Sequence, residues 1–292
     1  MTDGTRRLIG GLTLAGLLIG VGAGSRRRAP ADRTGGWRPR SGLDSSTSSR
    51  PRRRRPLPAP GGSKSGSAPA PPRVAPASDR GSFGIDVYGP DGRTPNRAAV
   101  RAIRARGGST ICYVDAGTWE SWRPDAARFP RHLRGRPNGW PGEHRLDIRQ
   151  TGELLPLMAA RVARCRSAGF EGGEVDNVDG FANATGFPLT SAQQLRYNRD
   201  LVALAHRQGL AAGLKHDLGQ VRALPPAVDV AIDGQCAQYA ECDRLRPFLA
   251  AHKAGFEIEY TLAPARFCPA AAGRSAGAKR PALRARPWTP CR

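Results

Sequence analysis

The chain has 292 residues and a formal net charge of +22 at pH 7. Its first 80 residues contain 16 Arg and Lys but only 4 Asp, so they carry +12 of this charge, and the high overall charge does not identify a nucleic-acid ligand for the remainder. The six cysteines form an even set without a C-x-x-C pair, which excludes the usual zinc and thioredoxin-like spacings and favours disulfides.

The first 25 residues have the order of a secretory signal peptide. Arg6 and Arg7 precede a mostly apolar run over residues 8–21, and small residues follow it. The run is short for a membrane span, although the arginines at 26–28 also fit a retained anchor. We therefore expect residues 1–25 to be a signal peptide or membrane anchor, and the protein to be secreted or attached to the cell envelope.

Residues 26–81 consist mainly of Pro, Ser, Gly and Arg, with few side chains that could form a core. This composition predicts a disordered basic linker. The arginine run at 52–55 could bind nucleic acid, but in an exported protein we favour attraction to anionic polymers of the cell envelope and expect no nucleic-acid partner.

From residue 82 to residue 292 short apolar runs alternate with helical stretches, which predicts one further domain. The predicted strands cover 83–88, 110–114, 145–148, 173–176, 211–215, 228–232 and 256–260, with an eighth near 281–288. A capping box of Ser191 and Gln194 predicts the start of one helix. Glycines just ahead of strands predict helix ends, at Gly107, Gly169, Gly209 and Gly255. This alternation predicts an α/β fold, a (β/α)8 TIM barrel.

No G-x-G-x-x-G follows the first predicted strand and no phosphate-binding G-x-x-x-x-G-K-[ST] occurs, so we expect no nucleotide cofactor. In a TIM barrel the functional side chains lie at the C-terminal ends of the strands. The polar residues at those predicted ends are Asp86, Tyr88, Asp115, Asp147, Glu174, Asp176, Lys215, His216, Asp233, Glu257 and Glu259. Singly, each Asp could cap a helix, but together they indicate a site.

The segment from Glu174 to Gly180 is the strongest local signal. Glu174 and Asp176 point to the same side of a strand, while Asn177 and Asp179 belong to the loop. The segment does not have the register of a calcium loop, so we expect no metal. Paired carboxylates suit glycoside hydrolysis. Aromatic residues that could stack on sugars, or anchor the packing, follow the strands at Trp119, Trp122, Trp140, Phe181 and Tyr239.

Five ordered blocks resemble the endo-α-1,4-polygalactosaminidase family (glycoside hydrolase family 114): ICYVDAGTWE at 111–120, GWPGE at 139–143, EVDNVDG at 174–180, GLKHD at 213–217 and QCAQYAEC at 235–242. The resemblance implies a TIM-barrel, endo-acting glycosidase that degrades α-1,4-linked galactosamine-containing polysaccharide. It places the family's first catalytic carboxylate, a nucleophile or base, on Asp176. The second, a Glu in the family, falls on Gly234, while Asp115 and His216 stand where the family has Ser and Asn.

Asp233 and Glu259 are the candidate replacements for the missing acid, which is typically worth about 10²–10⁴-fold in rate. The alternative is a catalytically impaired carbohydrate-binding or cell-envelope protein. The residues expected to bind substrate are Asp86, Tyr88, Asp115, Trp119, Glu174, Asp179, Lys215 and Tyr239. We also expect a disulfide between Cys236 and Cys242, which are close enough in sequence to close one loop, and a monomeric protein.

Overall fold

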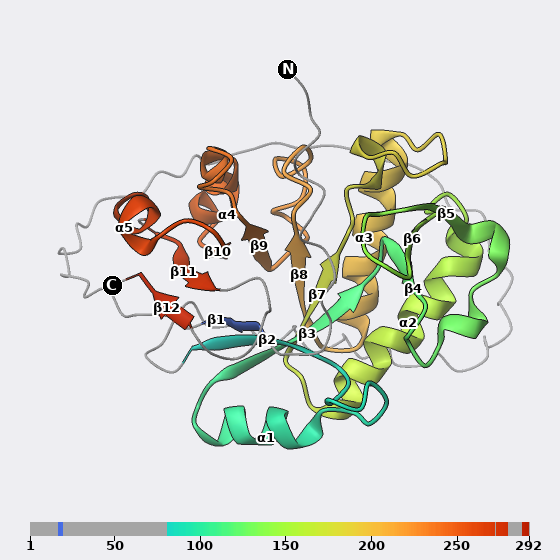
Figure 1. Cartoon of the computed structure of the whole chain (residues 1–292), viewed down its shortest axis with the longest axis horizontal. Helices are drawn as coiled ribbons and strands as arrows, with labels where there is room; N and C mark the ends of the chain where they lie inside the picture. Colours follow the sequence, from blue (N-terminus) through green and yellow to red (C-terminus); the bar gives the residue numbers. More distant parts are fainter. Residues whose placement is uncertain (1–16, 20–80, 272, 280–287, 292) are drawn as a thin grey trace, which may run out of the picture. The chain divides into compact units, whose positions relative to one another are not determined.

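The computed structural model describes residues 17–19, 81–271, 273–279 and 288–291 (Figure 1). The predicted signal peptide or anchor and the predicted linker lie outside the described residues, except for residues 17–19 and residue 81. Most of the predicted eighth strand, over 281–287, also lies outside them. No helix in the described part of the chain is long and apolar enough to cross a membrane.

A curled sheet of parallel strands organises the described residues (Figure 1). Its parallel strands, in spatial order, are β2 (Ser82–Asp86), β3 (Ser109–Asp115), β7 (Gly172–Asp176), β8 (Ala211–Lys215), β9 (Val230–Gly234), β10 (Ala254–Glu259) and β11 (Ser275–Lys279). Two short strands, β1 (Leu17–Ile19) and β12 (Trp288–Pro290), pair antiparallel with β2 and β11. Because β1 also contacts β11 and β12, the two ends of the sheet approach each other. The predicted α/β class is confirmed.

One predicted strand does not belong to the parallel sheet. The run at 145–148 falls on β6 (Glu143–Leu146), which pairs antiparallel with β4 (Thr118–Glu120) and β5 (Arg134–Pro137) in a separate small sheet. The turn at 139–142 brings β5 and β6 together, so β6 pairs with its neighbour in sequence instead of crossing over to join the parallel sheet. Conversely, β11 was not predicted, because its sequence SAGAK lacks the β-branched and aromatic residues typical of strands.

Helices cover the outer face of the curled sheet. Their bounds are α1 (Arg97–Ala105), α2 (Thr151–Ala168), α3 (Ser191–Arg207), α4 (Arg246–Ala250) and α5 (Pro264–Phe267), with 3-10 turns η1 (Ala126–Arg128), η2 (Arg131–Leu133), η3 (Gly180–Ala182), η4 (Cys242–Leu245) and η5 (Cys268–Ala270). Both α2 and α3, to one side of the central strands in Figure 1, pack against each other; α2 contacts β3, and α3 contacts β7 and β8. The connection from β8 to β9 contains turns but no helix.

The predicted end of α2 is correct, whereas the predicted start of α3 is shifted by one residue. Helix α2 ends as expected at Gly169, whose φ of 94° is the left-handed cap. The capping box of α3 is formed by Thr190 and Gln193, one residue earlier than predicted, because Thr190 has extended backbone and Ser191 is already helical. Gly255 lies inside β10, and His252, with φ 55°, takes the left-handed conformation after α4.

The two faces of the sheet differ in character. Alternate residues of the strands, such as Val114, Val175 and Leu214, pack with the helices in the main hydrophobic core. The inner face of the curl holds a smaller apolar cluster of Ile111, Val230, Ile232, Phe256 and Ile258. Further along the same inner face, toward the C-terminal ends of the strands, polar side chains replace apolar ones. The inner face therefore leads from an apolar base to a polar rim.

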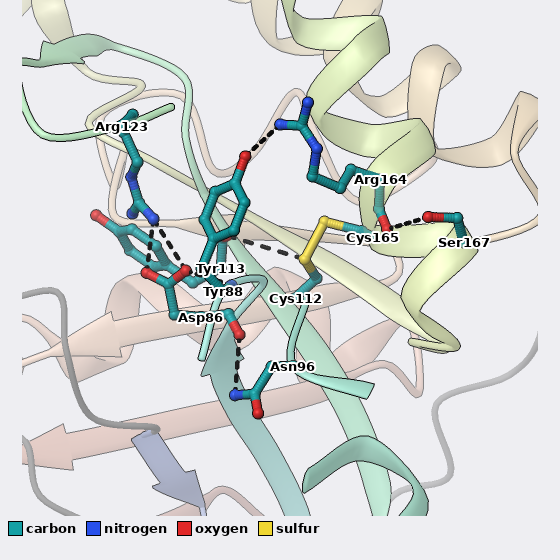
Figure 2. The surroundings of a disulfide bond; sticks show 9 residues. All are labelled: Asp86, Tyr88, Asn96, Cys112, Tyr113, Arg123, Arg164, Cys165 and Ser167. Atoms are coloured by element: carbon teal, nitrogen blue, oxygen red, sulfur yellow. Dashed lines mark hydrogen bonds and ion pairs between the residues drawn. A yellow bond between two sulfur atoms is a disulfide. The ribbon is translucent and has the colours of Figure 1, made fainter. Parts of the chain in front are cut away.

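Three disulfides join the described residues. Cys112–Cys165 ties β3 to α2 (Figure 2), and Cys268–Cys291 ties the segment after α5 to the end of β12. The predicted pair Cys236–Cys242 is present and closes the loop after β9.

Removing the long-range disulfide is expected to destabilise the protein more than removing the short one. The bond Cys112–Cys165 spans 53 residues of sequence and Cys236–Cys242 spans 6, so loop-closure entropy predicts losses of about 4 and about 2 kcal/mol in unfolding free energy. Guanidinium unfolding of the two double Ala variants without reductant measures both values. Equal losses, or the reverse order, would contradict this entropic account.

Candidate functional site

A cavity of about 300 Å³ lies at the C-terminal ends of β7, β8 and β9. The turn between β5 and β6 contributes one wall through Asn138 and Trp140, so the small antiparallel sheet completes the site. Asp233 and Gly234 at the end of β9 and Arg145 of β6 also line it. The segments after the parallel strands contribute the rest: Asn177, Asp179, Phe181, Ala182, Asn183, His216, Asp217, Leu218, Gly219, Gln235, Tyr239, Glu241, Arg244 and Tyr260.

Asp176 lies near this cavity on the inner face of the sheet and is 1% exposed. Its Oδ2 accepts a hydrogen bond from Lys215 Nζ at 2.9 Å and another from Tyr113 Oη at 3.1 Å. Its Oδ1 accepts one from the backbone N–H of Asn177 at 2.8 Å. The register of the sheet explains this convergence, because Tyr113 in β3, Asp176 in β7 and Lys215 in β8 share one face of three neighbouring strands.

The cluster keeps Asp176 ionised. Burial alone would raise the pKa of Asp176, but the Lys215 ammonium, His216 and the hydrogen bonds outweigh it and the net pKa is lowered. Burial likewise opposes the charge of Lys215, yet Asp176 and Glu174 raise its pKa. Glu174, whose Oε1 lies 3.6 Å from Lys215 Nζ, has its pKa raised to about 7 by burial. One fixed ion pair therefore lies beside a carboxyl group that titrates near neutrality.

His216 follows β8 and connects Asp176 to the cavity. Its Nδ1 lies 3.6 Å from Asp176 Oδ1, and its side chain is 32% exposed. Burial of the ring, helped by Lys215 and opposed by Asp176, lowers the pKa of His216. At neutral pH the ring is consequently neutral, and Lys215 is the main counter-charge of Asp176.

Left-handed backbone is concentrated at the cavity. Of the six non-glycine residues with positive φ in the described part of the chain, Asn177, His216, Asp217 and Gln235 line the cavity, with φ between 51° and 69°. Each directly follows the end of a strand or its first loop residue. Such conformations cost about 1–3 kcal/mol and persist where surrounding contacts hold them, which is typical of functional sites.

Sequence reasoning did not select several residues of this site. Asn177, Asp217, Gln235 and Tyr260 line the cavity, and burial, with a contribution from Asp179, raises the pKa of Asp217 to about 8. Their positions in the sequence could have identified them, since all four lie within two residues of the C-terminal end of a parallel strand.

The predicted site residues fall into three groups. Asp179, Asp233 and Tyr239 line the cavity. Asp176, Glu174 and Lys215 form the buried charged cluster. The other predicted residues, Asp86, Tyr88, Asp115, Trp119 and Glu259, do not line the cavity.

Internal contacts account for that third group. Asp86 accepts two hydrogen bonds from Arg123 Nη1, and Tyr88 Oη is hydrogen-bonded to Arg164 beside the disulfide Cys112–Cys165 (Figure 2). The indole N–H of Trp119 donates to the carbonyl of Ala126. These side chains support the strands rather than present polar atoms to the cavity.

The two candidate acids lie on the outer face of the sheet. In β9, Ile232 belongs to the inner apolar cluster and Ala231 to the outer core, so alternation assigns Gly234 to the inner face and Asp233 to the outer face. In β10, Ile258 is on the inner face, and Glu259 turns the other way to accept a hydrogen bond from the N–H of Ala237 at 2.8 Å. Asp233 borders the cavity at the end of β9, but neither strand directs its carboxylate along the inner face toward Asp176.

Among the described residues, two groups of side chains have the proximity of metal ligands, but most of their donor atoms are already bonded. Cys236 and Cys242 lie near Glu257 but are joined in a disulfide. The carboxylate oxygens of Asp115, Glu120 and Glu143 lie within 4.8 Å of one another and are buried.

Most carboxylate oxygens of that acidic cluster already accept hydrogen bonds from neighbouring residues. Glu120 forms a double hydrogen bond with Arg123, and Asp115 accepts from Thr118 and from Asn177 Nδ2. Glu143 pairs directly across from Glu120 in the small sheet. Like charges at such a position repel, and burial followed by Asp115 raises the pKa of Glu143 to about 9. A protonated Glu143 fits the cluster better than a cation does.

Folding stability is expected to fall as pH rises from about 5 to about 9. The folded state keeps Glu143 and Asp217 protonated through pKa values of about 9 and about 8, whereas the unfolded chain releases both protons near the ordinary values of 4.5 and 3.8. The stabilisation is therefore complete at acid pH and lost as pH passes the folded values. Urea unfolding at pH 5, 7 and 8.5 measures the slope.

The variant Glu143→Gln should make this slope shallower, because Gln has the shape of the protonated carboxyl and no proton to lose. The exposed Glu153→Gln is the matched control and should leave the slope unchanged. A slope that Glu143→Gln does not alter would mean that Glu143 is ionised in the folded protein.

Comparisons with known proteins identify a family to which this chain is similar. The model of glycoside hydrolase family GH114 matches residues 73–284. Among solved structures, the chain is similar to Ega3 of Aspergillus fumigatus in complex with galactosamine, with TM-score 0.64 and 28% identity over 70% of this chain and 85% of that chain. It is also similar to the glycoside hydrolase domain of PelA from Pseudomonas aeruginosa, with TM-score 0.48 and 19% identity over 64% and 84%. No curated protein matches significantly.

Proposed function

Because the chain belongs to glycoside hydrolase family GH114, we propose that it is an endo-acting hydrolase of α-1,4-linked galactosamine-containing polysaccharide, with Asp176 as the nucleophile or base. The observation that carries this proposal is the ionised carboxylate of Asp176, held by Lys215 and Tyr113 beside a cavity at the ends of the strands. A carboxylate in that state can attack an anomeric carbon or activate water.

The chemistry of the cavity supports a cationic sugar as substrate. Carboxyl side chains of Asp179, Glu241 and Asp233 line it together with Arg145 and Arg244, and an amino sugar without its acetyl group carries a positive charge that these carboxylates can attract. Trp140 and Tyr239 offer aromatic surface against which a pyranose ring can stack. The similarity to Ega3 in complex with galactosamine agrees with this choice.

The proposal includes the architecture and location of the enzyme. We take the curled sheet to be a TIM-barrel-type scaffold, in which sites lie at the C-terminal ends of the strands. Three disulfides favour an oxidising compartment, and hence a secreted or cell-envelope-attached protein.

Incubation of the purified full chain with partially deacetylated α-1,4-galactosaminan tests the function. Mass spectrometry should detect a range of oligosaccharides, as an endo-acting enzyme produces, rather than monosaccharide alone. Chitosan, with β-1,4-linked glucosamine, is the matched polymer and should stay intact. Absence of any product from galactosaminan would refute the proposal.

A second candidate, a carbohydrate-binding protein without turnover, is favoured by one observation, the glycine at position 234 on the inner face of β9. It predicts that galactosaminan binds to the unmodified protein without being cleaved. It also predicts that Gly234→Glu creates hydrolysis where there was none.

A further inference from the structure

The side chain that is missing at Gly234 would point at His216. Gly234 ends β9 on the inner face and lines the cavity. A Cβ added there would lie 3.4 Å from His216 Nε2 and 3.3 Å from Tyr260 Cε2. A Glu at 234, as the family resemblance leads one to expect, would therefore extend alongside the imidazole of His216. The histidine ring lies against the space that this carboxylate would fill.

The two ring nitrogens of His216 face different surroundings. Its Nδ1 lies 3.6 Å from Asp176 Oδ1, and its Nε2 is the atom nearest to the missing side chain. The backbone N–H of His216 donates to the carbonyl of Ile232 in β9 at 3.0 Å, which ties this residue to the strand that carries Gly234. One nitrogen thus faces the buried carboxylate, while the other faces the cavity.

We propose that His216 replaces the missing glutamate as the proton donor, delivering a proton from Nε2 to the leaving oxygen of a glycoside bound in the cavity. This proposal rests on the proposed function, because it assigns the acid of that same hydrolysis. It also accounts for two departures from the family pattern together: the histidine at 216 lies 3.4 Å from where a Cβ at position 234 would stand.

The reaction balances with water as the only co-reactant. The bond between the anomeric carbon and the glycosidic oxygen breaks, its electron pair stays on that oxygen, and the proton from His216 Nε2 converts the leaving group into an alcohol. Water then supplies the hydroxyl group of the new reducing end. Its other proton returns to His216 if Asp176 acts as the nucleophile and is displaced by the water, or goes to Asp176 if Asp176 acts as the base. Asp176 stabilises the charge that develops at the anomeric carbon.

The neighbouring acids are less well placed to donate. Asp217 is 2% exposed, and its Oδ2 accepts a hydrogen bond from Asn198 at 2.8 Å. Burial raises the pKa of Tyr260 to about 12, far above that of an efficient acid at neutral pH. His216 is the one of these three side chains that combines partial exposure, at 32%, with a ring nitrogen directed at the place of the missing glutamate.

The surroundings of the ring predict an acid pH range for activity. The ionisable groups that influence it are Asp176 on β7, Lys215 on β8, Asp179 after β7, and Glu241 before η4, and Tyr260 lies beside Gly234. Burial and Lys215 lower the pKa of His216 more than the carboxylates raise it. Because the donor must be protonated, activity should decline as pH rises through this lowered pKa.

The variant His216→Asn introduces the residue usual in the family and tests the proposal. Both residues tolerate the left-handed backbone at φ 61°. On galactosaminan we expect a loss of about 10²–10⁴-fold in kcat/KM, with loss of the alkaline limb of the pH profile. On a dinitrophenyl α-glycoside of α-1,4-linked galactosamine disaccharide, whose leaving group needs no proton, the loss should be less than about tenfold.

His252→Asn is the matched control. His252 is exposed and has φ 55°. It lies just before β10, at the N-terminal ends of the strands and away from the cavity, so activity should not change. The double variant His216→Asn/Gly234→Glu should recover activity, because the new carboxylate has room once the ring is gone. Gly234→Glu alone should gain less than it does when combined with His216→Asn, since its Cβ meets both His216 and Tyr260.

The outcomes separate this inference from the proposed function. If the unmodified chain cleaves galactosaminan and Asp176→Asn does not, but His216→Asn retains full activity and its alkaline limb, His216 is not the donor. An equal loss of activity on both substrates in His216→Asn would also overturn this inference, because such a loss would indicate that His216 only positions other groups. If the unmodified chain cleaves neither substrate, the proposed function itself fails, and this inference with it.

Discussion

Asp176→Asn is expected to reduce kcat/KM on galactosaminan by roughly 10⁴-fold or more, with little change in KM. The amide retains the shape of the carboxylate and can still accept hydrogen bonds from Lys215 and Tyr113. It cannot act as nucleophile or base, and it cannot balance the charge at the anomeric carbon. Steady-state kinetics on the polysaccharide and on the dinitrophenyl glycoside measure the loss, which should appear on both.

The fold of this variant should persist, because the Lys215 ammonium keeps a second carboxylate, Glu174, at 3.6 Å. Circular dichroism and urea unfolding verify that point. Asp229→Asn is the matched control, since Asp229 also accepts a backbone hydrogen bond and contacts a basic side chain, His206, but it precedes β9 at the N-terminal ends of the strands, away from the cavity. Activity in folded Asp176→Asn equal to that of Asp229→Asn would exclude Asp176 from the chemistry.

Lys215→Met is expected to have the largest effect on stability, about 3–5 kcal/mol near neutral pH. The ammonium is buried between Asp176 and Glu174, so its removal leaves two buried carboxylates without their main counter-charge. Methionine fills similar volume, which limits the effect to the loss of charge and hydrogen bonds. Urea unfolding at several pH values measures it.

The sign of the pH dependence follows from the lost cation. Without Lys215 the pKa values of Asp176 and Glu174 rise, so the folded variant binds protons that the unfolded chain releases. Its stability should therefore approach that of the unmodified protein at acid pH and fall behind it as pH rises. For the same reason the acid limb of kcat/KM should move to higher pH, because more alkaline solution is needed to ionise Asp176.

Lys253→Met provides the control for this substitution. Lys253 is half-buried, and its ammonium donates to the backbone carbonyl of Val228, near the N-terminal ends of the strands and away from the cavity. Its loss should change neither limb of the pH profile. An unshifted acid limb in Lys215→Met would mean that Lys215 does not control the ionisation of Asp176.

Much of the fold was predictable because its causes are local. Alternating runs and a glycine such as Gly169 reflect the conformational preferences of a few neighbouring residues, and they predicted the parallel strands other than β11 and the end of α2. The family was also predicted correctly from five short motifs, and a family model matching residues 73–284 confirms it. Predictions were wrong where local pattern was ambiguous, as at 145–148, since a four-residue run does not reveal which partner it pairs with.

Site residues were less predictable because side chains compete for distant partners. Asp86 has the place of a site residue at the end of a strand, yet Arg123, 37 residues later, takes both of its oxygens. The sequence pattern does not indicate that Arg123 will bind Asp86. Trp140 enters the cavity wall only because an antiparallel insertion folds over the ends of the strands.

The amino-acid sequence by itself determined the class of fold, the family and the disulfide Cys236–Cys242, and it made Asp176 the leading candidate, since each of these is encoded in residues that are near one another or match a motif. Only the tertiary structure decided what surrounds Asp176. Lys215 and Tyr113 meet it across neighbouring strands, and His216 lies against Gly234, although 18 positions separate them in the chain. Such contacts depend on strand order and on the alternation of faces, which arise when the whole sheet forms.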